Sequence, residues 1–180
     1  SGQLSGSAYF LGKSAADMVH VLGAPLLFAT VYAYLSMTTV PFTTLYLICA
    51  GIYMVGSGVA YVVSVGAADA QTVVVATGYV VICTLLGSFN ESVQALHEYI
   101  PASLAVAVPR LAFAHWTIEA FYLGVVRPYR DIYVTGPAIE AVGMSVDEEH
   151  LSVAVPFFFG LIFRVVALVT MVRKNKLEFS

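Results

Sequence analysis

The residues that could bind a nucleotide lie near the start of the chain, where Gly6 precedes a Gly12-Lys13-Ser14 sequence. A phosphate-binding loop needs four residues between its glycines, with a strand before the loop and a helix after it. Here five residues separate the two glycines, and no strand-like segment precedes them. The segment therefore predicts the beginning of a helix, and we expect this chain to carry no nucleotide site of its own.

Histidines and carboxylates are the next candidates for chemistry, because they ligate metals and transfer protons. His97 and Glu98 begin a metalloprotease-like pattern, but the second histidine of that pattern would fall at Pro101. Asp17 and His20 share one face of a helix, yet a zinc site uses three or four ligands. The sequence therefore predicts no catalytic residue, no metal site and no cofactor-binding residue.

The composition indicates the kind of structure that must hold such residues in place. Charged residues make up 11% of the 180 residues, against about 25% in ordinary globular domains. Hydrophobic residues make up 59%, and the mean hydropathy is +0.86. These values exclude a soluble domain, a disordered chain and a nucleic-acid-binding protein, which would need clustered Lys and Arg. The sequence predicts an all-α integral membrane protein with several transmembrane helices.

Uncharged runs and prolines place about four transmembrane helices, each of which needs about 20 apolar residues. No charged residue occurs between Met18 and Ala68, so this run holds two spans, and Pro41 divides them. Valine runs near residue 75 would suit a strand in water, but a lone strand in lipid leaves its backbone groups unpaired. The predicted spans are therefore residues 19–38, 42–65, 70–89 and 151–172.

The segment 100–126 is apolar, but Pro101 and Pro109 break any continuous helix through it. The positive-inside rule places Lys13 and the basic tail 173–180 on the cytoplasmic side, which requires an even number of crossings. Four spans satisfy this rule if 100–126 is re-entrant from the outer face. The predicted organisation is an amphipathic cytoplasmic lead-in over 1–18, a transmembrane domain over 19–172 with an outer loop at 127–150, and the tail.

Polar residues inside the predicted membrane segments are candidates for a transport pathway or gate. Arg164 lies nine residues before Arg173, and it either extends toward the cytoplasmic surface or forms an interhelical ion pair. His115, Trp116 and Glu119 can share one side of a short helix. That helix would lie at the outer interface with its tryptophan in the aromatic belt, or it would form a gate at the outer end of a pathway.

Two stripes of residues along the predicted spans suggest helix packing or a substrate pathway. Gly56, Ala60 and Ser64 recur every four residues along the second span, and small residues at this spacing let helices approach closely, within the bundle or across a dimer. Phe28 and Tyr32 form an aromatic stripe on the first span. Such a stripe indicates packing or lipid contact, with a pathway for hydrophobic substrates as the alternative.

Three motifs in order resemble those of one transporter family. Residues 8–13 (AYFLGK), followed by Asp17 and Pro25, are similar to the "AYFLAK…D…P" start of the third membrane helix in ABC transporters of the G subfamily, the White-type half-transporters. Residues 116–121 (WTIEAF) resemble that family's "W-A-x-E-A-F" segment, and residues 164–167 (RVVA) resemble its final helix. Together the motifs cover nearly the whole chain, with the greatest similarity to the plant and protist branch.

This resemblance implies that the chain is the C-terminal part of a type-two ABC exporter membrane domain, which lines the pathway of lipids or other hydrophobic substrates. In that family a nucleotide-binding domain, which takes ATP and Mg, precedes the membrane domain, and two half-transporters pair as a homodimer or heterodimer. The resemblance thus makes the chain part of an ATP-hydrolysing translocase in which it carries no ATPase site. Ser1 would then be a cut within a longer multi-pass protein of the plasma membrane or another cellular membrane.

Two other functions are compatible with the sequence. A small helical membrane protein with a scaffold or assembly role needs no motif beyond apolar spans. An ion-coupled carrier should show paired charges at mid-membrane, and Arg164 is the one candidate. The sequence does not distinguish among lipophilic substrates, and it does not indicate whether the sequon at Asn90 is glycosylated.

Overall fold

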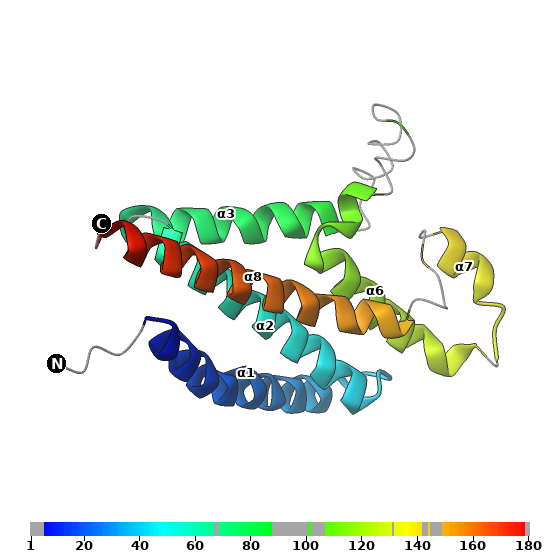
Figure 1. Cartoon of the computed structure of the whole chain (residues 1–180). Helices are drawn as coiled ribbons and strands as arrows, with labels where there is room; N and C mark the ends of the chain where they lie inside the picture. The colour runs from blue at the N-terminus through cyan, green and yellow to red at the C-terminus, as the bar shows by residue number, and fades with distance from the viewer. Residues whose placement is uncertain are drawn as a thin grey trace.

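The computed structural model of the chain describes residues 6–66, 69–87, 101, 107–130, 132–141, 144 and 149–178. These residues form helices and turns, with no strand among them, and this confirms the predicted all-α fold. The long helices lie side by side in a bundle (Figure 1). We call the end of the bundle that holds the start of the first helix and the end of the last helix the inner end, and the opposite one the outer end.

The first two helices form an antiparallel pair. α1 spans Gly6–Ser36 and α2 spans Phe42–Gly66, so the predicted break at Pro41 is confirmed. α1 begins well before residue 19, because the expected lead-in and the first span form one continuous helix with Pro25 inside it. α1 is bent along its length rather than straight (Figure 1). The cytoplasmic position of its first residues stays a prediction.

Two further helices complete the long elements. α3 spans Asp69–Gly87, and its valine-rich sequence is helical as predicted; α8 spans Glu149–Glu178. Among the described residues, three helices are long and apolar enough to cross a membrane, namely α1, α2 and α8. The apolar part of α3, Gln71–Gly87, is shorter than these three helices. The last two residues of the span expected at 70–89 lie outside the described residues.

The predicted break within 100–126 is present in the described part of that segment. Residues 107–110 form one helical turn, the chain bends at Leu111 and Ala112, and α6 then spans Phe113–Val126. Ala112 has an extended backbone, with φ −90° and ψ 125°, so the helix cannot run through it. Whether this broken segment is re-entrant in a bilayer stays a prediction.

α6 begins beside the far end of α3, so these two short helices follow one another along one side of the bundle. A Cβ atom on Gly87 would lie 2.5 Å from the His115 backbone nitrogen, and only glycine permits this approach. Phe113 packs in one cluster with Phe163, which lies near the middle of α8. α6 therefore starts near mid-height in the bundle and continues to the outer end, as a re-entrant helix would.

The most extensive contact in the bundle joins α2 to α8. A Cβ atom on Gly58 would lie 2.8 Å from the Gly160 carbonyl oxygen and 2.9 Å from the Phe163 Cβ. A Cβ atom on Gly160 would lie 2.5 Å from the Met54 side chain. The two backbones approach closely because these positions carry no side chain, which is how small residues pack membrane helices.

The segment expected to be an outer loop, 127–150, contains short helices in its described residues. η1 spans Arg127–Tyr129, and α7 spans Gly136–Ala141. Ile139 and Met144 are buried against Leu123 of α6. These apolar contacts fix the segment to the outer end of α6.

Candidate transport groove and buried polar clusters

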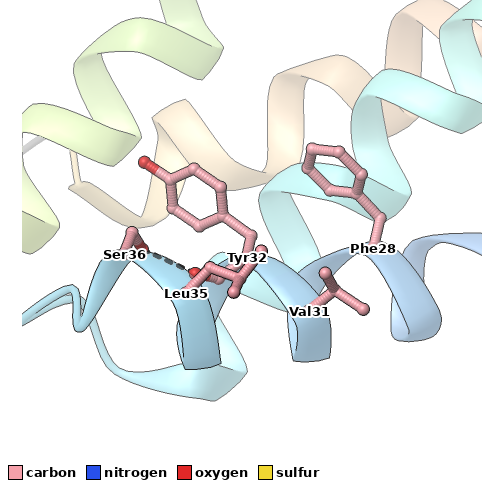
Figure 2. A pocket seen from close by; sticks show the side chains of 5 residues that line it. All are labelled: Phe28, Val31, Tyr32, Leu35 and Ser36. Atoms are coloured by element: carbon pink, nitrogen blue, oxygen red, sulfur yellow. Dashed lines mark hydrogen bonds between the residues drawn. The ribbon is translucent and has the colours of Figure 1, made fainter.

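An apolar groove of about 280 Å³ lies among α1, α2 and α6. A second groove of about 320 Å³ lies next to it along α1, and Figure 2 shows its five lining side chains. Phe28 and Tyr32 belong to both grooves, so they separate the two. The walls of the first groove are Phe28, Tyr32, Leu45, Ile48, Cys49, Ile52, Thr117, Ile118 and Phe121.

Aromatic contacts fix the two rings that divide the grooves. Phe28 and Tyr32 are one helical turn apart on α1 and stack with ring centroids 6.1 Å apart. Tyr32 also meets Phe121 of α6 edge-on, with centroids 6.3 Å apart. The structure thus places both predicted aromatic residues on a groove wall, where Tyr32 contacts α6 and Phe28 stays largely exposed, and the choice between lipid contact and a substrate pathway stays a prediction.

The groove walls present almost only carbon. The Ser36 hydroxyl donates a hydrogen bond of 2.6 Å to the Tyr32 carbonyl (Figure 2). The Thr117 hydroxyl likewise donates one of 2.9 Å to the Ala114 carbonyl. Because their hydroxyls are used by the helix backbone, the grooves suit hydrophobic ligands, which are bound mainly by apolar contact.

The predicted gate residues lie on α6 and face the interior of the bundle. Glu119 is 2% exposed and accepts a hydrogen bond of 2.9 Å from the Ser152 hydroxyl of α8. Trp116 is buried and donates a hydrogen bond of 2.8 Å to the Arg110 carbonyl, across the bend in the chain. His115 is half-buried and its ring meets the Trp116 ring edge-on. The tryptophan is therefore an internal contact rather than part of an aromatic belt, and the gate role stays a prediction.

Arg164 adopts neither of the two arrangements expected from the sequence. It is 6% exposed, so it does not extend to the surface, and within the described residues it makes no direct ion pair. Its Nη1 donates a 2.9 Å hydrogen bond to the Ser14 hydroxyl of α1, and its Nη2 donates one of the same length to the Ser57 hydroxyl of α2. Arg164 thus joins three helices at one point.

Tyr61 of α2 connects this arginine to a carboxylate. The Arg164 guanidinium lies 5.5 Å from the centroid of the Tyr61 ring, within the range of a cation–π contact. The Tyr61 hydroxyl donates a hydrogen bond to the Asp17 carboxylate of α1. The Lys13 amine lies 5.8 Å from the same ring. We call Ser14, Asp17, Ser57, Tyr61 and Arg164 the polar clasp.

Sequence reasoning identified only the arginine of this clasp. A signal for the α1 partners exists, since Phe10, Ser14, Asp17 and Val21 recur at spacings of three and four residues and form one face of a helix. Phe10 and Val21 are buried, and both polar residues between them are half-buried. The polar positions on this otherwise apolar face mark the site of contact.

Within the part of the chain that the structure describes, no helix packs against the predicted stripe on α2. Gly56, Ala60 and Ser64 are exposed, and a Cβ atom on Gly56 would meet nothing within 4 Å. Gly51 and Gly58 make the close helix contacts instead. Of the two alternatives for the stripe, only packing across a dimer stays a prediction.

Metal chemistry finds no support in the described part of the chain, where no three His, Cys, Asp or Glu residues are close enough to hold an ion. The site is thus a hydrophobic groove in a bundle of membrane-type helices, a class typical of membrane transport proteins.

Comparison with known families agrees with this class. The sequence model of the ABC-2 type transporter family matches residues 1–177, so the chain belongs to that family. It is an integral membrane protein and forms a membrane part of an ABC transporter, which pairs with a nucleotide-binding domain. Searches of curated proteins and of solved structures gave no match.

Proposed function

We propose that this chain is the C-terminal part of the membrane domain of a G-subfamily exporter and that it lines the route of lipids or other hydrophobic substrates. The family match supports the transporter class, and the AYFLGK, WTIEAF and RVVA motifs, in that order, favour the subfamily. In this proposal the chain crosses the membrane several times, and two half-transporters pair in the plasma membrane or another cellular membrane.

The groove that Phe28 and Tyr32 border is the observation that indicates the class of substrate. Its walls come from three helices, and the hydroxyl of Thr117 in its wall is engaged with the helix backbone. The burial of hydrocarbon in an apolar groove of this kind is favourable, whereas its walls provide no group that would offset the desolvation of a charge. Lipophilic compounds are therefore the substrates that this surface fits best.

ATP and Mg²⁺ would bind to the nucleotide-binding domain rather than to these residues. Gly12 and Lys13 lie inside α1, and Ser14 accepts a hydrogen bond from Arg164. These residues therefore form no loop that could surround a phosphate. When bound at its own domain, ATP would supply the free energy that moves the membrane helices.

The test of the proposed pathway is to fill the groove with a larger side chain. In the full-length transporter, Ile52→Trp should lower the ATP-dependent transport of a fluorescent lipid in proteoliposomes severalfold, because Ile52 lines the groove. The matched control is Ile82→Trp, since Ile82 is also an exposed isoleucine but lies on α3, away from the groove. The control should transport within about twofold of the parent, as surface substitutions usually change little.

Equal transport by the two tryptophan variants would remove the groove from the pathway. If the full-length parent protein itself exported no lipophilic compound, the scaffold role would replace the exporter.

The gate role of Glu119 has a separate test. Glu119→Gln removes the charge from a buried carboxylate that accepts a hydrogen bond from Ser152, so transport or maturation of the full-length protein should fall. Glu148→Gln, in the polar segment before α8, is the control and should leave both unchanged. Normal activity in both variants would show that Glu119 is not part of the gate.

A further inference from the structure

α1 is attached to the rest of the bundle by two contacts of different kinds. Toward the inner end, Ser14 and Asp17 belong to the polar clasp. Toward the outer end, Ala29 and Tyr32 pack in an apolar cluster with Val40 of the connecting turn and residues of α2 and α6. The inner half of α1 is therefore held by a few directional bonds and the packing of Phe10, and its outer half by a larger apolar cluster.

The polar clasp is incomplete in the closed arrangement. Arg164 uses both of its terminal nitrogens, but its buried Nε finds no partner among the described residues. A buried donor without a partner costs free energy, so the clasp recovers only part of the desolvation of the guanidinium. This arrangement holds the inner half of α1 in place more weakly than a fully paired cluster would.

A hinge lies between the two attachments. Pro25 is buried inside α1, and its ring removes the backbone donor that the Val21 carbonyl would otherwise receive. Kinks and hinge motions of helices concentrate at such prolines. Within the hinge region itself, between Val21 and Pro25, the Leu22 carbonyl accepts a hydrogen bond of 3.3 Å from the Tyr46 hydroxyl of α2.

The inner half of α1 covers an apolar seam. Phe10 packs with Tyr61 and with Ala167 of α8, next to Leu168 and Met171. α1 contacts α8 much less than it contacts α2, so little besides this cluster and the clasp closes the seam. Displacing the inner half of α1 would uncover hydrocarbon surface on α2 and α8 at the inner end of the bundle.

The geometry points to a lateral gate: the inner half of α1, Gly6 to Val21, swings about Pro25 when the polar clasp opens, and the uncovered seam admits lipophilic molecules from the inner leaflet. The identity of what passes rests on the proposed function, whereas the motion itself does not. Arg164 lies near the middle of α8, so in this proposal opening also requires water to enter the seam and hydrate its guanidinium and the Asp17 carboxylate.

The test compares how well two buried cysteines, one under the inner half of α1 and one on its outer half, are protected from alkylation in the full-length transporter. Cys49 and Cys83 are first replaced by alanine, and a single cysteine is then introduced by Ala167→Cys or by Ala29→Cys. Both alanines are 0% exposed; the first lies under the inner half of α1 and the second lies on the outer half. The readout is the alkylation rate by a membrane-permeant maleimide, which requires neither ATP nor transport.

The clasp is weakened by Tyr61→Phe, which keeps the ring but deletes the hydroxyl that donates to Asp17. We expect alkylation at Ala167→Cys to rise about tenfold, since a hydrogen bond to a charged group is lost. Ala29→Cys should stay protected. Adding Pro25→Ala, which restores the missing backbone donor, should return Ala167→Cys toward its original rate, because the hinge is stiffened.

Two controls keep the result specific. Tyr46→Phe deletes a tyrosine hydroxyl that also donates from α2 to α1, but to Leu22 in the hinge region rather than to the clasp, so it should not expose Ala167→Cys. Ser14→Ala removes a different bond of the clasp and should reproduce the effect of Tyr61→Phe. Unchanged protection in both clasp variants, or an equal rise at Ala167→Cys and Ala29→Cys, would overturn the gate. A confirmed gate in a protein that exports no lipid would instead refute the proposed function alone.

Discussion

α2 contacts α8 and α1 in two different ways. Toward α8, glycines bring the two backbones together, so that Gly58 faces Gly160 with no side chain between them. Toward α1, the inner contact is made by the Tyr61 ring and hydroxyl and by hydroxyl groups that bind Arg164. The first contact depends mainly on shape, with hydrogen bonds from Arg164 and Lys174 of α8 beside it, whereas the second depends on hydrogen bonds that other polar groups can replace.

This difference indicates which helices can move relative to one another. When two backbones that meet at glycines separate by a fraction of an ångström, they lose much of their dispersion attraction. α2 and α8 therefore form a rigid unit. Long side chains with hydrogen bonds tolerate larger displacements if new partners are found. The bundle therefore combines a fixed pair, α2 and α8, with a peripheral helix, α1, whose inner half is held by replaceable bonds.

The largest effect is expected at the glycine contact. Gly58→Ala forces a methyl group against the Gly160 carbonyl and should lower the unfolding free energy by about 1–3 kcal/mol, the usual cost of overpacking. Gly56→Ala, two positions away on the exposed face, meets no neighbour and should be neutral or stabilising by up to about 1 kcal/mol. Thermal unfolding followed by size-exclusion chromatography in detergent measures both. The same sign for the two variants would contradict the rigid pair.

A smaller effect is expected where α3 ends against α6. Gly87→Ala places a methyl group 2.5 Å from the His115 backbone nitrogen, but the last residue of a helix can shift, so the loss should be about 1–2 kcal/mol. Gly78→Ala lies within the same helix with open space around it and should not destabilise. Equal melting temperatures for the two variants would show that the junction is loose.

The smallest effect is expected at the clasp. Ser57→Ala removes the acceptor of the Arg164 Nη2 donor and should cost about 1 kcal/mol, because water can partly replace it. Ser64→Ala, on the exposed face of the same helix, deletes only a local bond to the Tyr61 carbonyl and should change little. Hydrogen exchange along the inner half of α1 should rise in the first variant and not in the second. A loss as large as that of Gly58→Ala would make the two sides of α2 equivalent.

Breaks in the helices could be predicted because prolines and charges interrupt an otherwise apolar sequence. Pro41 separates α1 from α2 as expected, and the break before α6 falls within the predicted segment. The start of the first helix was harder to predict, because the residues before Met18 carry charge and yet belong to the same helix. Charge defines where a span must stop in lipid, but a helix can extend beyond the membrane.

The faces of the helices could not be predicted, for a physical reason. In a membrane protein both the interior and the lipid-facing surface are apolar, so periodicity alone does not show which face is buried. α2 therefore offers two stripes of small residues, and the structure packs Gly51 and Gly58 rather than Gly56, Ala60 and Ser64. The partners of Arg164 were missed for the same reason, because hydroxyl groups are common on either face.

The end-to-end arrangement of α3 and α6 has a mechanical consequence. An unbroken helix without an internal proline, such as α2, acts as a strut, so a push at its inner end reaches its outer end. The column formed by α3 and α6 has a joint at Gly87 and His115, and the stacked rings of Tyr79 and Phe113 hold its two pieces together. Such a column can bend at the joint while side-chain packing keeps the pieces in contact, so its inner and outer pieces need not tilt together.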